Sequence, residues 1–265
     1  MPFASLSPVT QALVAFLAVL LPTLLFTPDP GSSTAAIQSV LLQFFLVALI
    51  PVILAHLLNR DEQTVLKLRS VGARNLLWCL LLAFSAVFLL DEIVFWQERL
   101  TGAQANLSPD IQKLLHADSP LQLVWRLFAL ALVPAICEEL LFRGFIFGRF
   151  LQTGQPGQSL MMTSLLFGLF HRNLAALLPT TLAGIFLAFA VWRTGSVYCA
   201  MAMHALINTW AILVVNTRLE EFLAWTRQSS HVPAALLFLG VAGVVVAGKQ
   251  LRPEHVAGAR ERDSC

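Results

Sequence analysis

Eight apolar segments follow one another along this chain of 265 residues. A transmembrane helix needs about 20 mostly apolar residues, and most of the segments come close to that length. Only 12% of the residues are charged, about half of the roughly 25% found in soluble domains. The sequence therefore predicts an all-α fold, a polytopic membrane bundle of about eight transmembrane helices at 9–27, 36–58, 75–95, 121–147, 159–171, 174–192, 196–215 and 232–248.

The chain shows no internal repeat and no low-complexity linker, so residues 1–265 are expected to form a single integral membrane domain. The net charge of +2 is too small to suggest a nucleic-acid partner, and the lipid bilayer is the expected surrounding. The first apolar segment has no preceding basic residues and is followed by further segments, so it is interpreted as a transmembrane helix and not a cleaved signal peptide.

Basic residues between the segments predict the orientation. With a cytoplasmic N-terminus, ten lie inside and five outside, as the positive-inside rule requires. Both termini are therefore expected in the cytoplasm. The inside group is Arg60, Lys67, Arg69, Arg74, Arg149, Arg193, Lys249, Arg252, Arg260 and Arg262, and the outside group is Arg99, Lys113, Arg172, Arg218 and Arg227.

The polar stretch 96–120 interrupts the apolar pattern and is expected outside the membrane, as a loop or a surface helix. It could act as a lid over a substrate or as a plain connector, and the connector is the simpler interpretation. Asp91 and Glu92 come just before it, at the predicted end of the third span, where water can solvate them.

The fourth span carries ionisable residues in its middle, which are costly in a bilayer and by default mark function. Glu139 and Arg143 are four residues apart, so they share a helix face and can form an ion pair. Glu138 points about 100° away and has no partner within its own helix. An unpaired carboxyl group in an apolar site has a raised affinity for protons, which suits acid–base chemistry.

Two later segments carry polar residues at matching depths. His171 follows Phe167 by four residues, and Asn208 follows His204 by four, which again places each pair on one face. At 1.5 Å per residue, four polar groups lie about 12–18 Å from the predicted cytoplasmic ends of their helices. They are Glu138, His171, His204 and Asn208. The sequence thus predicts one site near the membrane midplane, in a catalytic core at about 121–215.

A glutamate, two histidines and an amide in a water-filled intramembrane pocket can hydrolyse a peptide bond. Glu138 would take a proton from water and His171 would help to hold that water. His204 and Asn208 would donate hydrogen bonds to the developing oxyanion.

A metal-dependent alternative stays open at this point. Neither the HExxH zinc motif nor the GxSxG nucleophile motif occurs. Glu138, His171 and His204 could nevertheless bind a catalytic zinc ion, because two histidines and one glutamate are a known zinc ligand set. The expectation is that no cofactor is needed, with zinc as the alternative.

The order EExxxR, FxxxH and HxxxN on successive apolar segments resembles the CPBP family, which includes the type II CAAX prenyl endopeptidases and bacteriocin-processing membrane proteins. The resemblance implies a glutamate-dependent intramembrane protease. It implies that Glu138 is the base that activates water, His171 its partner, and His204 and Asn208 the oxyanion side. Glu139, Arg143 and Phe167 match the supporting motif positions.

The expected function is cleavage near the C-terminus of a lipidated or membrane-anchored protein or peptide, in a bacterial plasma membrane. The alternative is a non-catalytic immunity or scaffold protein on the same fold, or a small transporter. Every motif position is filled, which argues against a degenerate protease. Paired repeats and broken helices in both halves, which are typical of transporters, are absent from the sequence pattern.

Overall fold

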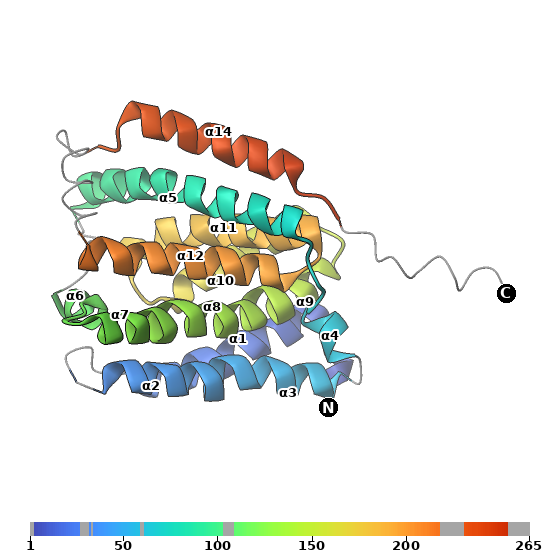
Figure 1. The fold of residues 1–265 in the computed structure, drawn as a ribbon. Coiled ribbons are helices and arrows are strands. Elements are labelled where there is room, and N and C mark those ends of the chain that lie inside the picture. Colours follow the sequence, from blue (N-terminus) through green and yellow to red (C-terminus); the bar gives the residue numbers. More distant parts are fainter. Residues whose placement is uncertain are drawn as a thin grey trace.

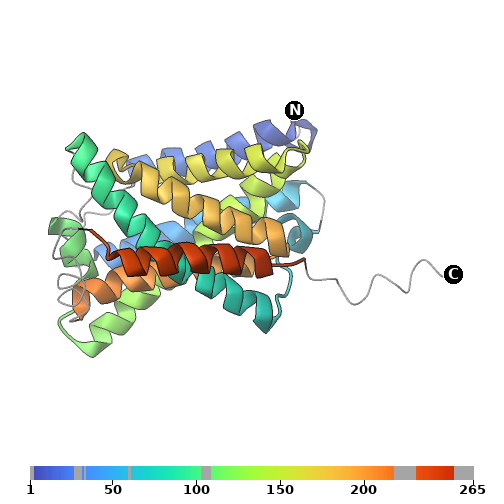
Figure 2. The ribbon, with the colours of Figure 1, turned by 90° about the horizontal axis from the view of Figure 1, so that it is seen from above.

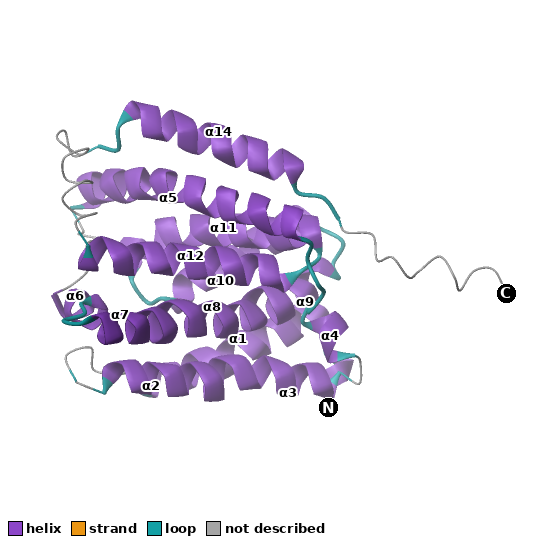
Figure 3. Ribbon diagram, viewed as in Figure 1, coloured by secondary structure: helices purple, strands orange, loops and turns teal. Residues whose placement is uncertain are grey.

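The computed structural model describes residues 3–26, 32, 34–58, 61–102, 109–217 and 231–253, without the side chains of 109–111 and 175. Within these residues the fold is entirely helical, and no strand occurs (Figure 3). The predicted all-α class is therefore confirmed.

The helices follow the apolar segments of the sequence closely. Several consecutive elements join into one span where an α-helix passes through a π-helical turn. The elements are η1 (Phe3–Ser5), α1 (Pro8–Leu25), α2 (Ala35–Leu42), η2 (Gln43–Ala48), α3 (Leu49–Leu57), α4 (Glu62–Val65), α5 (Ala73–Thr101), α6 (Pro109–Leu115), α7 (Pro120–Arg126), η3 (Leu127–Leu132), α8 (Val133–Glu139), η4 (Leu140–Ile146), α9 (Phe147–Leu151), α10 (Pro156–Phe170), η5 (Leu174–Ala176), α11 (Leu177–Thr194), α12 (Val197–Asn216) and α14 (Ala234–Gln250).

Six helical stretches of the described chain are long and apolar enough to cross a membrane: Pro8–Leu25, Ala35–Leu57, Ala73–Thr101, Pro120–Leu151, Leu177–Thr194 and Val197–Asn216. The remaining two predicted spans are also helical but shorter, since α14 has 17 residues and α10 has 15. The chain is thus an integral membrane protein, and all eight predicted segments form helices.

The span Pro120–Leu151 lies in the middle of the bundle and contacts α12, η2, α1 and α10 (Figure 1). Helix α14 packs along α5 at one edge, and α10 packs along α11. Viewed from above, α14 ends on the side of the bundle where α1 begins (Figure 2). Helices α1 and α10 both end on the opposite side, as α10 follows α9 back across the bundle.

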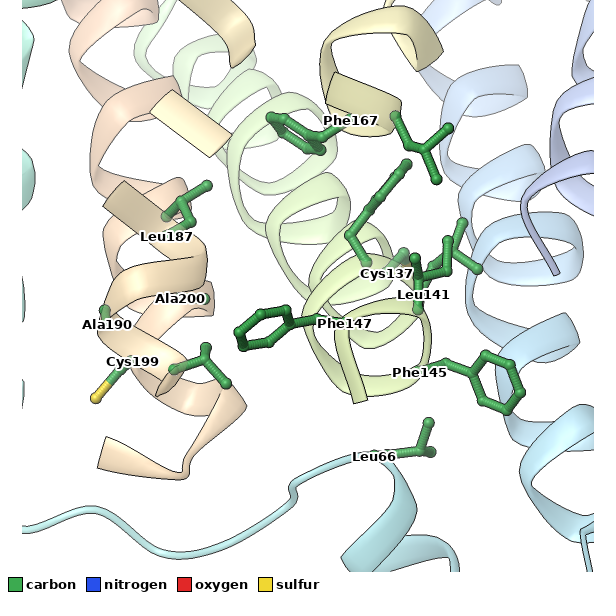
Figure 4. Packing of buried hydrophobic residues seen from close by; sticks show 14 of the residues in the cluster. Leu66, Cys137, Leu141, Phe145, Phe147, Phe167, Leu187, Ala190, Cys199 and Ala200 are labelled. Carbon is green, nitrogen blue, oxygen red and sulfur yellow. The ribbon is translucent and has the colours of Figure 1, made fainter. Parts of the chain in front are cut away.

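Aromatic side chains of η4 and α9 fill the core around the central span (Figure 4). Phe142, Phe145 and Phe147 are completely buried. Gly144 sits among them because a Cβ atom there would lie 3.0 Å from the carbonyl oxygen of Leu66. This close approach holds the linker after α4 against the central span.

Helix α5 does not end where the apolar pattern suggested. It continues to Thr101, so the interpretation of Glu92 as a helix-end residue is wrong. The carboxylate of Glu92 lies 2.8 Å from Nδ1 of His231 and accepts a hydrogen bond from the main-chain N–H of Val232 at 3.0 Å. Glu92 therefore ties α5 to the segment that starts α14, a contact 139 residues away in sequence.

The predicted polar connector 96–120 contains the last turn of α5 and the short helix α6, with residues 103–108 outside the described part. The orientation in the membrane stays a prediction. Several residues on which it depends lie outside the described residues, namely Arg60, Arg218, Arg227, Arg260 and Arg262.

Candidate active site

The acidic residues of the central span stand at a π-helical turn. Helix α8 ends with Glu138 and Glu139, and the π-helical turn η4 that follows contains Arg143. A second π-helical turn, η2, begins with Gln43 on the neighbouring span. Such turns widen a helix locally and are frequent at functional sites. Here they occur where the two spans face each other, since η2 contacts α8.

The predicted ion pair between Glu139 and Arg143 is confirmed. Nη1 of Arg143 lies 2.7 Å from Oε1 of Glu139, and both side chains are fully buried. Nη2 of Arg143 also donates to the carbonyl oxygen of Gly184, at 3.1 Å. The same Oε1 atom lies 2.8 Å from Nδ1 of His204. The ion pair thus connects the central span to α12 through the carboxylate of Glu139 and to α11 through the guanidinium of Arg143.

Phe167 lies at the centre of these groups. Its ring centroid is 4.2 Å from the guanidinium carbon of Arg143, a cation–π contact that is strongest when both groups are removed from water. The ring also meets His171 and His204 edge to face, at 4.7 and 5.7 Å between centroids. The phenylalanine of the FxxxH motif therefore fixes the relative positions of the arginine and both histidines.

Glu138 faces a different neighbourhood from Glu139. Its Oε1 accepts a hydrogen bond of 2.8 Å from Nε2 of Gln43, whereas Oε2 is buried without a hydrogen-bond partner among the described residues. The carboxylate lines a pocket of about 170 Å³ together with His171. One water occupies about 30 Å³ of liquid volume, so the pocket has room for a few water molecules beside Glu138.

The tautomer of His171 follows from its main-chain contact. Nδ1 of His171 lies 2.9 Å from the carbonyl oxygen of Phe167. A carbonyl oxygen only accepts hydrogen bonds, so Nδ1 carries the proton. In the neutral ring Nε2 is then an acceptor. His171 is exposed and lines the pocket, so it can offer this acceptor to a water molecule there.

The structure divides the predicted site residues into two groups. Glu138 and His171 share the pocket, whereas the lining contributed by the described chain does not include His204 and Asn208. His204 is buried against Glu139, and Nδ2 of Asn208 donates to the carbonyl oxygen of Leu130 over 3.4 Å. The sequence predicted that four polar groups converge in one layer. The structure has two adjacent clusters, Glu138 with His171 and His204 with Glu139, and the ring of Phe167 contacts both histidines.

The zinc set considered from the sequence does not form a ligand cluster. Across the described residues, no three His, Cys, Asp or Glu side chains are grouped so that they could hold a metal ion. Glu138, His171 and His204 are separated because His204 turns toward Glu139. The donor set in this arrangement does not fit a three-ligand zinc site.

Sequence reasoning missed Gln43, which holds the carboxylate of Glu138. A signal was present, because Gln43 and Gln38 are polar residues within the apolar segment 36–58.

Sequence reasoning also missed the role of Gly168, which follows Phe167. A Cβ atom there would collide with the hydroxyl of Thr181 and lie 3.1 Å from the main-chain oxygen of Leu177, so glycine allows α10 and α11 to approach closely.

The remaining lining of the pocket comes from the ends of α1 and α10 and from the start of the second span. These residues are Thr23, Phe26, Ser39, Leu42, Val47, Phe170 and Arg172. Arg172 directly follows His171 and adopts a left-handed backbone conformation with φ of 54°. That conformation costs a non-glycine residue about 1–3 kcal/mol.

A larger open pocket of about 560 Å³ adjoins the first and shares Phe26 and Leu42 with it. Its lining is otherwise Leu25, Gln38, Leu41, Phe45 and Leu46, which is apolar except for one glutamine. Pockets that bind organic ligands usually measure about 300–1,000 Å³. The small pocket alone is below that range, and the adjoining apolar pocket is within it.

Known proteins resemble the segment of the chain that carries the predicted site residues. Residues 120–210 match the type II CAAX prenyl endopeptidases described as Rce1-like. This segment is similar to the Rce1-like family. It holds every predicted site residue, from Glu138 to Asn208, and the resemblance predicted from the three motifs is confirmed.

A curated relative points the same way. The chain is 27% identical over 109 residues to YdiL of Bacillus subtilis, which is named as a candidate membrane peptidase. The match covers 41% of this chain and 45% of that relative, so it spans less than half of either protein. No solved structure matches. Outside the Rce1-like segment, Gln43 and the end of α1 complete the pocket from spans that the family match does not cover.

Proposed function

We propose that this protein is an intramembrane endopeptidase in which Glu138 activates water. The observation that carries the proposal is the buried carboxylate of Glu138, which accepts a hydrogen bond from Gln43 and belongs to a residue that lines a pocket together with His171. The Rce1-like match of the same segment supports it. Peptide hydrolysis inside a membrane requires such a water-holding pocket, since the bilayer core supplies no water.

In the proposed reaction, the carboxylate of Glu138 takes a proton from a water molecule while the water oxygen attacks the carbonyl carbon of the scissile bond. Nε2 of His171 accepts the second hydrogen of that water and orients it. The carbonyl oxygen becomes an oxyanion in the tetrahedral intermediate. Glu138 then returns its proton to the leaving nitrogen as the C–N bond breaks, which restores the carboxylate.

The second cluster acts as support in this proposal. Glu139, Arg143 and Phe167 fix the end of α8 against α10, α11 and α12 and so set the direction of the adjacent Glu138. The assignment of His204 and Asn208 to the oxyanion remains a prediction. Both residues belong to α12, which contacts α8, so a substrate that enters between these helices would meet them.

The substrate class follows from the surroundings of the pocket. The adjoining apolar pocket is open and suits an acyl or prenyl chain, or an apolar helix. We therefore assign to this protein a lipidated or membrane-anchored protein or peptide substrate, cleaved near its C-terminus. No metal ligand set is part of the proposed mechanism.

The test compares the C-termini of membrane proteins and peptides in cells with the wild-type protein, with Glu138→Gln, or without the protein. Shortened C-termini should appear with the wild-type protein alone. Asp118→Asn is the matched control, because it also removes one carboxylate but on an exposed loop, and it should behave as wild type. If a cellular role persists in Glu138→Gln with no change in any C-terminus, the protein acts as a non-catalytic immunity or scaffold protein.

A further inference from the structure

Three basic side chains gather where the linker after α4 meets the end of the central span. Nζ of Lys67 lies beside the backbone of α9, since a Cβ atom at Gly148 would be 3.6 Å from it. Arg149 is the next residue of α9, and Arg69 lies in the same linker as Lys67. Both guanidinium groups are near enough to repel the amine of Lys67. We call Lys67, Arg69 and Arg149 the basic cluster.

The ammonium group of Lys67 has no counter-ion in the described part of the chain. No oxygen atom there accepts a hydrogen bond from Nζ. Burial, with the charges of Arg149 and Arg69, lowers the pKa of this amine to about 8, and no carboxylate acts against that shift. Lys67 is therefore charged near neutral pH although burial and its neighbours both oppose the charge. Its side chain is half-buried, so an anion from outside can still reach Nζ.

The start of α12 holds the main chain of the basic cluster. The carbonyl oxygen of Lys67 accepts a hydrogen bond of 3.0 Å from the N–H of Val197, and that of Arg69 accepts one of 2.6 Å from the hydroxyl of Ser196. Ser196 is the N-cap residue of α12, yet its side chain makes no capping hydrogen bond to the first turn. The uncapped N–H groups of this 20-residue helix add partial positive charge near the cluster.

The basic cluster lies where membrane-spanning helices begin and end. Arg149 is in the last turn of the span Pro120–Leu151, α5 begins at Ala73 shortly after Lys67, and α12 begins at Val197. These ends lie on one side of the bundle, beside α4 (Figure 1). The ends of membrane spans adjoin the headgroup layer, and basic groups between spans are typical binding sites for anionic headgroups.

We propose that the basic cluster binds the phosphate group of an anionic phospholipid, with Nζ of Lys67 as the hydrogen-bond donor. Arg69 and Arg149 contribute through their charge; Arg149 keeps its own packing, with its guanidinium carbon 5.7 Å from the ring centroid of Phe145. Hydrogen bonds between a cation and a phosphate are among the stronger ones in proteins. A bound phosphate would supply the missing negative charge and stabilise the contact of the linker with α9 and α12.

This site is separate from the pocket of Glu138 and does not depend on the proposed protease function. None of the three cluster residues lines that pocket. A free phosphate ion has the same chemistry as the lipid headgroup, so the experiment includes both. The location at the span ends favours the lipid.

The first measurement titrates the full-length protein, in a neutral detergent near neutral pH, with phosphatidylglycerol or phosphatidylcholine and records the midpoint of thermal unfolding. Phosphatidylglycerol should raise the midpoint of the wild-type protein more than phosphatidylcholine, which has no net charge. Lys67→Gln should weaken the apparent affinity for phosphatidylglycerol about 10–100-fold, the range of one hydrogen bond to a charged group. Lys67→Arg should keep most of it. Lys67→Gln should fold, since it removes a charge that its neighbours repel.

Lys249→Gln is the matched control, because it makes the same substitution at an exposed lysine in the last turn of α14. It should keep the wild-type affinity. If Lys67→Gln and Lys249→Gln weaken binding equally, the lipid responds only to surface charge and the proposal is wrong. It is also wrong if phosphatidylglycerol leaves the wild-type midpoint unchanged.

Acylation of Lys67, followed by mass spectrometry, reports on Nζ itself and separates the two sources of phosphate. Phosphatidylglycerol should slow the acylation of Lys67 severalfold at fixed pH and leave that of Lys249 unchanged. Equal protection by inorganic phosphate, with no further effect of the lipid, would reassign the site to a free phosphate ion. A raised unfolding midpoint without protection of Lys67 would show that the lipid binds elsewhere, and would overturn the proposal.

Discussion

Nδ1 of His204 lies 2.8 Å from Oε1 of Glu139, the same oxygen atom that accepts the hydrogen bond of Arg143. This contact decides how the two adjacent glutamates differ. Glu139 is held by a cation and an imidazole in a fully buried network, whereas Glu138, one residue earlier, is held by the neutral amide of Gln43 beside a pocket. The carboxylate with fewer partners is the one with space for water.

Loss of the buried cation should damage the fold before it affects the chemistry. Arg143→Ala leaves Glu139 buried with only His204 as partner, and breaking a buried ion pair costs about 3–5 kcal/mol. We expect a lower yield of folded protein and a lower midpoint of thermal unfolding in detergent. Arg74→Ala is the control, since Arg74 makes an exposed contact with Gln250 and should cost at most about 1 kcal/mol. A normal midpoint for Arg143→Ala would show that the pair contributes little.

Substitutions at three of the four predicted catalytic residues should differ in their effect on the rate. Glu138→Gln keeps the shape but removes the base, so turnover should fall to background while the protein stays folded, and His171→Ala should resemble it. Asn208→Ala should cost about 10²–10³ in rate if Asn208 is an oxyanion donor. Single-turnover cleavage of a farnesylated peptide measures all three. A rate for Asn208→Ala equal to wild type would fit its weak contact with Leu130 and remove it from the site.

Metal dependence is tested on the same preparation. Activity should survive extensive chelation, because a carboxylate-activated water requires no ion. If chelation abolished cleavage and zinc restored it, Glu138, His171 and His204 would have to move together as ligands. The search for a base would then turn to Glu139.

Gln43 should control the rate through Glu138. Gln43→Leu removes a hydrogen bond to a charged group, worth about 1.5–3 kcal/mol, so kcat should fall about 10–100-fold. Gln43→Glu should be more harmful, since it replaces the hydrogen-bond donor by a second carboxylate that repels Glu138. Gln38→Leu is the control, as Gln38 lines the adjoining apolar pocket. Equal losses for Gln38→Leu and Gln43→Leu would contradict a specific role.

Lys67 should titrate at an unusually low pH. Burial, together with the nearby charges of Arg149 and Arg69, lowers the pKa of this amine to about 8. The amine is therefore neutral above pH 8 in the folded protein but still charged in the unfolded chain, so stability should rise between pH 8 and about 10.5. Acylation of Lys67, followed by mass spectrometry, should have a midpoint near pH 8.

The neighbouring arginines provide the internal comparison for Lys67. Arg149→Gln should raise the midpoint more than Arg69→Gln, because Arg149 contributes more of the repulsion. If neither change moves the midpoint, repulsion from these arginines does not contribute to the low pKa.

The topology also decides from which side substrates reach Glu138. Reporter fusions at Lys67 and at the C-terminus should both read as cytoplasmic, and one at Lys113 as external. The pocket is lined by the ends of α1 and α10, so this result would open it toward the external half of the membrane. An external C-terminus would contradict the predicted orientation. It would mean that one predicted span does not cross the membrane, and the short α10 is the first candidate.

The sequence by itself determined the helical fold, the positions of eight helices and the ion pair of Glu139 with Arg143. These features depend on local physics, since apolar length specifies a membrane helix and a spacing of four residues specifies one helix face. The Rce1-like motifs likewise lie within single helices, where neighbours in sequence are neighbours in space.

The tertiary structure alone decided how the polar groups are shared among helices. A helix fixes depth and face but not the rotation of its neighbours, so the sequence could not show that His204 turns to Glu139 or that Gln43, 95 residues before Glu138, holds its carboxylate. The same limit hid Arg172, whose place in the pocket depends on a contact with Thr23 from a span 149 residues away. Packing between distant spans, through glycines such as Gly168 that let helices approach closely, sets these relationships.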